Sequence, residues 1–154
     1  LNLRQGLAEL DWPILLMLAT MIPLGSAVET TGAAAFLADG LLSVLPSHDT
    51  LVVAAAIMPA PLPITPFVNN ASTALVLGPV AVGAAQASGL PPEPLLLAVA
   101  VGASVDFLTP IGHHNNTVVM GIAGYRFSDF PRAGWPVTLV VAVAAILALW
   151  AWRT

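Results

Sequence analysis

The sequence contains no cysteine and no lysine, and charged residues make up only 8% of its 154 positions. Without cysteine, a disulfide framework and metal or redox sites built on thiolates are excluded. The net charge is −4, and the basic stripe that nucleic-acid binding requires is absent. No nucleophile stands at a credible spacing from a base, and no glycine-rich loop precedes a basic residue. We therefore expect neither an enzyme nor a cofactor.

Hydrophobic residues, by contrast, make up 58% of the chain. Four apolar stretches are long enough, or nearly so, to cross a hydrocarbon core that needs roughly 20 helical residues. These stretches are 12–30, 51–64, 90–108 and 134–152. The composition predicts an all-α integral membrane protein.

Between these stretches the sequence predicts shorter or interrupted elements. Residues 31–45 carry Asp39 and are expected to form an interfacial amphipathic helix. Residues 65–88 are interpreted as a re-entrant hairpin, and residues 90–124 as a discontinuous span broken near 109–116. Because the chain begins with leucine, we expect residues 1–154 to be one transmembrane domain of a longer polypeptide.

Two interruptions of the apolar pattern echo each other. Residues 65–73 read TPFVNNAST and residues 109–117 read TPIGHHNNT, and together they hold four of the five asparagines. Moving an asparagine side chain into hydrocarbon without partners costs roughly 2–7 kcal/mol. One interpretation is that each pair merely caps a helix, which is the commonest use of asparagine at a helix start. Two such breaks at corresponding positions, however, are the best sequence pointer to the central site of a transporter.

The physics of the breaks favours charged ligands. A helix N-terminus presents unpaired N–H groups and a partial positive charge to an anion, and unwound carbonyl groups offer oxygens to a small cation. The small residues after the first tip, among them Ser72, allow the two tips to approach closely. This pattern predicts a carrier that couples a cation to an anion.

Three ionisable residues near the second break allow two interpretations each. Asp106 lies in an apolar span, where such groups are usually functional, but it can also be a helix-end carboxylate that reaches a water-filled vestibule. His113 and His114 can offset anion charge or titrate near physiological pH, or they can be solvated loop residues. A metal site would require a third ligand at suitable spacing, and the sequence offers none.

The two breaks, with the stretches DWPILLMLATMIPLGSAVETTG and GYRFSD, resemble the divalent anion/sodium symporter family of citrate-transporter-like permeases, within the ion transporter superfamily. The likeness is strongest to the bacterial sulfate-type permeases and covers almost the whole chain. It implies the second, C-terminal inverted repeat of an elevator-type transporter, a homodimer in the bacterial inner membrane. The N-terminal repeat of the same protein would then be a partner of this chain.

The resemblance also implies roles for residues of the breaks. Asn70 and Asn116 match positions that contact the anion, whereas Ala71 lacks the hydroxyl that dicarboxylate carriers have there. The full set of substrate-binding candidates is Asn69, Asn70, Ser72, Asn115, Asn116 and Thr117. The cation-binding candidates are Thr65, Val68, Asn69, Leu108, Thr109 and Pro110.

The resulting functional hypothesis is sodium-coupled transport of a small anion, sulfate-like or a di- or tricarboxylate. Three alternatives stay open at this point. One is a proton-coupled or exchange carrier with Asp106 or a histidine as the titrating group. The others are a non-transporting membrane scaffold and a half-size protein that completes itself as an inverted homodimer.

Overall fold

The computed structural model describes residues 12–111 and 113–152, and all regular secondary structure in these residues is α-helical. This agrees with the all-α class predicted from composition. The eight helices of the described part are α2 (Trp12–Thr30), α3 (Ala33–Ser43), α4 (Thr50–Ile57), α5 (Thr65–Val68), α6 (Asn70–Ser88), α7 (Pro92–Ser104), α8 (His114–Ala123) and α9 (Asp129–Trp152).

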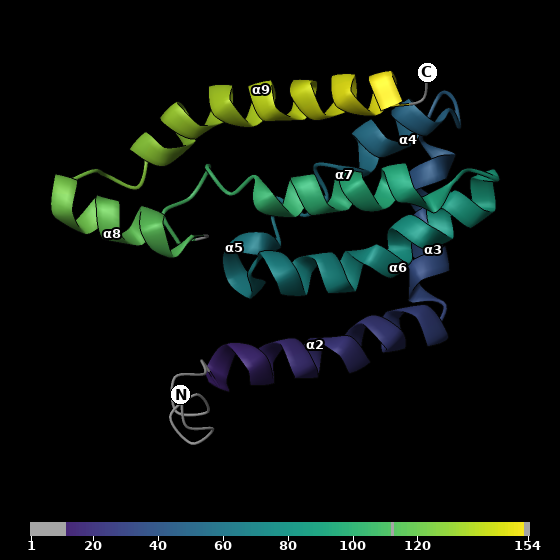
Figure 1. The fold of residues 1–154 in the computed structure, drawn as a ribbon, viewed down its shortest axis with the longest axis horizontal. Helices are drawn as coiled ribbons and strands as arrows, with labels where there is room; N and C mark the ends of the chain where they lie inside the picture. Colours follow the sequence, from purple (N-terminus) through teal and green to yellow (C-terminus); the bar gives the residue numbers. More distant parts are fainter. Residues whose placement is uncertain (1–11, 112, 153–154) are drawn as a thin grey trace, which may run out of the picture.

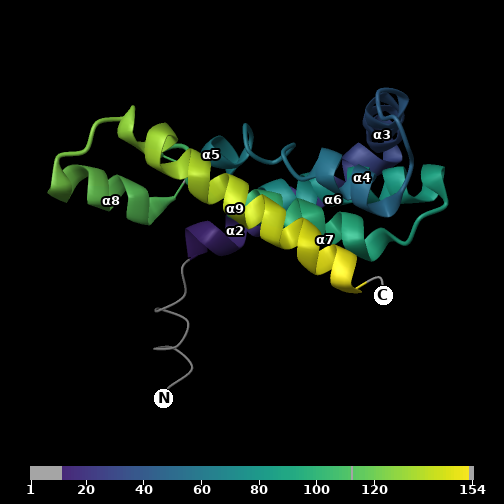
Figure 2. The same cartoon turned by 90° about the horizontal axis from the view of Figure 1, so that it is seen from above.

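Helix α6 lies at the centre of the molecule. It packs extensively against α2, α3 and α7, and α7 in turn contacts α4 and α9. Figure 1 shows α2, α6, α7 and α9 as four rows stacked across the view, with α3 and α4 crossing at one end. Helix α8 extends beyond the stacked helices at the opposite end, as Figure 2 also shows.

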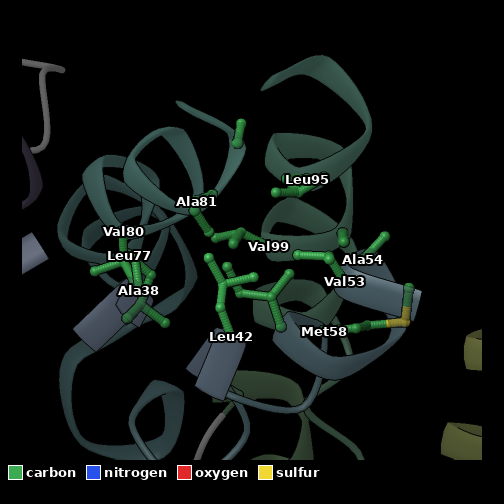
Figure 3. Packing of buried hydrophobic residues seen from close by; sticks show 14 of the residues in the cluster. Ala38, Leu42, Val53, Ala54, Met58, Leu77, Val80, Ala81, Leu95 and Val99 are labelled. Atoms are coloured by element: carbon green, nitrogen blue, oxygen red, sulfur yellow. The ribbon is translucent and has the colours of Figure 1, made fainter. Parts of the chain in front are cut away.

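The buried core lies where α3, α4, α6 and α7 meet (Figure 3). Ala38, Val53, Ala81, Leu95 and Val99 are each no more than 1% exposed. A Cβ atom on Gly102 of α7 would overlap the carbonyl oxygen of Met58, which follows α4. Small residues at helix interfaces allow backbones to approach closely, as is typical of helices associating in lipid. The core therefore depends on close fit between small side chains.

Two described helices, α6 and α9, are long and apolar enough to cross a membrane by length and composition. Helix α9 contains the predicted span 134–152 but begins earlier, at Asp129. Helix α2, with 19 residues, covers the predicted span 12–30. Helix α3 lies inside the stretch 31–45, for which the sequence predicts an interfacial helix.

The other two predicted spans are not continuous helices. In the stretch 51–64, α4 has only 8 residues and ends at Ile57, because the prolines that follow lack the N–H that an α-helix requires. In the stretch 90–108, α7 has 13 residues and ends at Ser104. Each of these helices is shorter than a crossing of the bilayer needs.

Both interrupted elements are present as helix breaks. At the first break, the single turn α5 and the helix α6 are separated only by Asn69. Because α6 has 19 residues, the second arm of the predicted hairpin is much longer than the first. At the second break, α7 ends at Ser104 and α8 begins at His114, so the unwound segment starts several residues before the predicted position. The re-entrant topology of residues 65–88 stays a prediction.

Large apolar side chains cover much of the surface of the described residues. Ile22 of α2, Phe67 of α5, Ile122 of α8 and Val140 of α9 are each more than 60% exposed. Exposed apolar side chains in this number suit contact with lipid or with further protein. The described helices thus have the exterior of a membrane protein.

Candidate functional site

The first break is shaped by the backbone of Asn69. Asn69 has φ 81°, and it is the only residue other than glycine with positive φ in the described chain. Asparagine tolerates this left-handed conformation better than most residues. Its side-chain Oδ1 accepts a hydrogen bond from the N–H of Ser72 at 2.9 Å, so Asn69 is the N-cap of α6. The capping interpretation of this asparagine therefore holds, and it leaves Asn70 as the residue available to a ligand at the tip.

Two threonine hydroxyls hold the backbone on either side of Asn69. Thr65 donates to the carbonyl oxygen of Pro61 at 2.9 Å, and Thr73 donates to the carbonyl oxygen of Asn69 at 2.7 Å. Both side chains are buried, at 2% and 0% exposure. Each hydroxyl oxygen retains lone pairs after donating. The first break is thus rigid and rich in acceptor oxygens.

Asn70 is the first residue of α6 and is half-buried. Its side-chain amide and the backbone N–H groups of Asn70 and Ala71 make no hydrogen bond to any other described residue. Val68, the last residue of α5, is also half-buried. The tip of the first break therefore presents several unpaired donors at a helix N-terminus, where the helix dipole adds partial positive charge.

In the second break, the side chain of Asn116 holds the unwound segment. Its Nδ2 donates to the carbonyl oxygens of Asp106, at 3.0 Å, and Thr109, at 3.1 Å. The hydroxyl of Thr117 donates to the carbonyl oxygen of Pro110 at 2.7 Å. With both amide hydrogens occupied, Asn116 offers a ligand only its acceptor oxygen in this conformation.

The histidines of the second break differ in position. His113 is the N-cap of α8, and its Nδ1 accepts a hydrogen bond from the N–H of Asn115 at 3.2 Å. Both His113 and Asn115 are exposed. His114 is the first residue of α8, and its side chain lies outside the described atoms. Within the described residues, no group of three or more His, Cys, Asp or Glu side chains is placed to hold a metal ion.

Asp106 is the buried carboxyl group of the second break. It is 6% exposed, and its Oδ2 has no hydrogen-bond partner among the described residues. Of the five buried polar side chains in the described chain, four belong to the two breaks: Thr65, Ser72, Thr73 and Asp106. The polar interior of this apolar molecule is therefore concentrated at the two breaks.

A cavity of about 420 Å³ between α4, α7 and α9 is almost entirely apolar, but a smaller one reaches the second break. The smaller cavity has a volume of about 320 Å³. It is lined by Phe107, Asn116, Val119, Tyr125, Asp129, Phe130, Ala133, Gly134 and Val137. Among these, the sequence pattern predicts a binding role for Asn116 alone. The aromatic run in GYRFSDF, which contributes Tyr125 and Phe130, is the signal in the sequence that points to the rest of the lining.

The two breaks lie at the same end of the helical stack, the end from which α8 extends (Figures 1 and 2). Helices α6 and α7 run antiparallel, with Gly78 facing Leu96, so the start of α6 lies beside the end of α7. Leu108 is half-buried and Pro110 is buried in the unwound segment between α7 and α8. None of the four main cavities among the described residues has lining residues from both breaks. This chain therefore provides a surface with two tips, and its described residues do not enclose a pocket between them.

The chain is similar to known transporters along almost its whole length. The family model described as citrate transporter matches residues 1–153. The uncharacterized transporter YfbS of Escherichia coli K12 is 30% identical over 147 residues, which cover 96% of this chain and 24% of that protein. An uncharacterized transporter of Synechocystis is 37% identical over 142 residues, covering 88% of this chain and 22% of that protein.

A further relative is named for its substrates. It is sodium/sulfate cotransporter 2 of Chlamydomonas reinhardtii, which is 26% identical over 148 residues, covering 94% of this chain and 16% of that protein. No solved structure matches the chain. The chain spans about a quarter of the length of the Escherichia coli and Synechocystis relatives. All three relatives are named as transporters or cotransporters, and none is named as an enzyme.

Proposed function

Because the chain belongs to the citrate transporter family, we propose that it is the part of a secondary active transporter that binds a small anion together with sodium as the coupling cation. The whole protein would carry both across the membrane. Among the anions, the sodium/sulfate relative and the hydroxyl-free Ala71 favour sulfate or a similar inorganic anion over a dicarboxylate.

The anion is assigned to the first break. Asn70 and Ala71 bring unpaired N–H groups to the start of α6, and the Asn70 amide adds two further donors. An anion at a helix N-terminus is stabilised both by these donors and by the helix dipole. No lysine is present in the chain and the described arginines are exposed, so neutral donors carry the recognition.

The cation is assigned to oxygens between the two breaks. The carbonyl oxygen of Pro110 accepts a hydrogen bond from Thr117 and has a second lone pair for an ion. The acceptor oxygen of Asn116 and the hydroxyl oxygens of Thr65 and Thr73 in the first break add to this set. Oxygen ligands of this kind suit a hard cation.

One observation carries the proposal: four of the five buried polar side chains in the described residues belong to the two breaks. If these three hydroxyls and the carboxyl group of Asp106 served only to end helices, there would be no reason to bury them at one end of an otherwise apolar stack. A bound ion would give partners to the two of these groups that have none, Ser72 and Asp106. Unsatisfied buried polar groups otherwise cost about 1–3 kcal/mol each.

Charge balance constrains the stoichiometry of the proposed cycle. Moving one elementary charge through a potential of 100 mV corresponds to about 2.3 kcal/mol. Inward movement of a doubly charged anion against an inside-negative potential therefore costs about 4.6 kcal/mol at 100 mV, and two sodium ions only offset it. We expect at least three sodium ions per sulfate if the potential is to drive uptake.

Uptake into proteoliposomes by the full-length protein tests this function. Labelled sulfate, succinate and citrate are supplied at fixed pH, with either sodium or choline outside. We expect sulfate uptake that requires sodium and is strongly reduced, but still measurable, in Asn70→Ala and Asn116→Ala. Gln86→Ala is the matched control, because it removes an exposed amide at the far end of α6. Undiminished uptake in choline would eliminate sodium coupling, and a folded protein with no uptake of any of the three anions would favour a scaffold.

A further inference from the structure

Asp106 has a structural role that the proposed function does not yet account for. Four buried side-chain oxygens in the described residues have no hydrogen-bond partner, and they belong to Ser72, Ser88, Asp106 and Thr138. Three of them are neutral hydroxyls. Only Asp106 can carry a charge, and an uncompensated carboxylate is far more costly to bury than a hydroxyl. A positively charged partner would offset the cost of burying the carboxylate.

The chain itself provides no such partner among the described residues. It contains no lysine, and Arg126 and Arg132 are both exposed near the start of α9. His113 is near enough to interact electrostatically with Asp106, but its Nδ1 accepts a hydrogen bond from the N–H of Asn115. His113 is also exposed, and it makes no hydrogen bond with the buried Oδ2 of Asp106.

Asp106 lies two residues beyond the end of α7, which packs along α6 and ends near its start (Figure 1). The next residue, Phe107, lies against Gly134 of α9, and residues 105–107 are not helical. The first turn of α6 carries the buried hydroxyl of Ser72, which also has no partner among the described residues.

We propose that the carboxylate of Asp106 is a direct ligand of the coupling cation, with the hydroxyl of Ser72 as a second ligand. This inference rests on the proposed function and adds an anionic oxygen to a site otherwise built from neutral ones. The carboxylate and a sodium ion together form a neutral pair. The cation therefore binds before the anion, and small hard cations such as Na⁺ and Li⁺ are preferred over K⁺.

Thermal stability of the full-length protein in detergent tests the proposal without any transported anion. Sodium chloride replaces choline chloride stepwise at constant ionic strength, and the sodium concentration that gives half of the stabilisation is measured. We expect Asp106→Asn, which keeps the size of the side chain but not its charge, to raise this concentration at least tenfold. Asp39→Asn is the control, because it removes an exposed carboxylate of α3 and should change nothing.

Ser72→Ala provides a second variant if Asp106→Asn does not fold, since it removes only an unpartnered hydroxyl. We expect a several-fold rise in the half-stabilising sodium concentration. If Asp106→Asn folds and its half-stabilising sodium concentration is unchanged, the inference is overturned. If Asp106→Asn does not fold, an unchanged concentration in Ser72→Ala overturns it. If sodium-dependent uptake persists alongside that result, the proposed function stands and only the role of Asp106 fails. If the wild type neither responds to sodium nor loses uptake in choline, both fail together.

Discussion

Gly134 offers a sharp test of how α9 and the second break depend on each other. A Cβ atom at this position would overlap the carbonyl oxygen of Phe107 and would lie 2.6 Å from its carbonyl carbon and 3.1 Å from its Cβ. These neighbours belong to backbone that cannot rotate out of the way. Gly134→Ala therefore forces α9 away from the unwound segment or displaces that segment itself.

The cost follows from the contacts that would move. Overpacking of a buried position costs about 1–3 kcal/mol. The same segment holds the two carbonyl oxygens that Asn116 binds, and each of these hydrogen bonds contributes about 0.5–1.5 kcal/mol. We therefore expect a loss of stability between about 1 kcal/mol, if only packing is strained, and about 6 kcal/mol, if both hydrogen bonds are also lost.

The assay compares thermal unfolding midpoints of the full-length protein in detergent, together with sodium-dependent uptake. Gly121→Ala is the matched control, because a Cβ on this α8 glycine has no neighbour within 4 Å. It should leave the midpoint unchanged or raise it, since glycine inside a helix is destabilising by about 0.5–1 kcal/mol relative to alanine. A midpoint for Gly134→Ala as high as that of the wild type would refute the close contact between α9 and the second break.

Three further predictions concern the breaks and the core. Asn69→Gly should unfold at a higher temperature than Asn69→Ala, because glycine tolerates φ 81° whereas alanine does not. Both variants lose the side-chain cap on the N–H of Ser72, and its replacement by alanine costs about 0.5–2 kcal/mol. Equal unfolding midpoints would contradict this order. Asn70→Ala should raise the half-saturating concentration of the anion more than that of sodium. Asn116→Ala should raise the half-saturating concentration of sodium more than that of the anion, and uptake titrations of each ion measure both values. Gly102→Ala should destabilise the protein by about 1–3 kcal/mol through overlap with the end of α4, whereas Gly40→Ala, in open space, should not lower the unfolding midpoint.

Much of the architecture is predictable because proline and helix caps act locally. The two Thr-Pro segments predict breaks, and α5 and α8 begin near them. The lengths of the helices between the breaks are less predictable. The apolar stretch 51–64 reads as a span, but its prolines end α4 at Ile57, and the apolar run of α7 ends before Asp106 although no proline is near. In the second case tertiary contacts decide, because Asn116 withdraws the backbone of residues 106–109 from helical geometry.

In the candidate site, too, some features are predictable from the sequence and others depend on tertiary packing. The asparagines are recognisable as special because amides are costly in an apolar chain, and the structure assigns Asn69 to capping and Asn116 to the unwound backbone. The cavity beside Asn116 is not predictable, since its lining comes from the loop before α9 and from one face of that helix. Which face of a nearly uniformly apolar helix turns inward cannot be deduced from periodicity.

The hydrogen bonds of the two breaks also indicate how one apolar chain would bind ions of both signs in the proposed cycle. At the first break the cap on α6 uses the acceptor oxygen of Asn69, and donors remain at Asn70 and Ala71. At the second break Asn116 uses its two donors on carbonyl groups, and its acceptor oxygen remains. The cap at the first tip thus uses an acceptor oxygen, and the unwound segment at the second tip uses the donors of an amide. What is left favours an anion at the first tip and a cation at the second, and placing the tips side by side makes each bound ion stabilise the other.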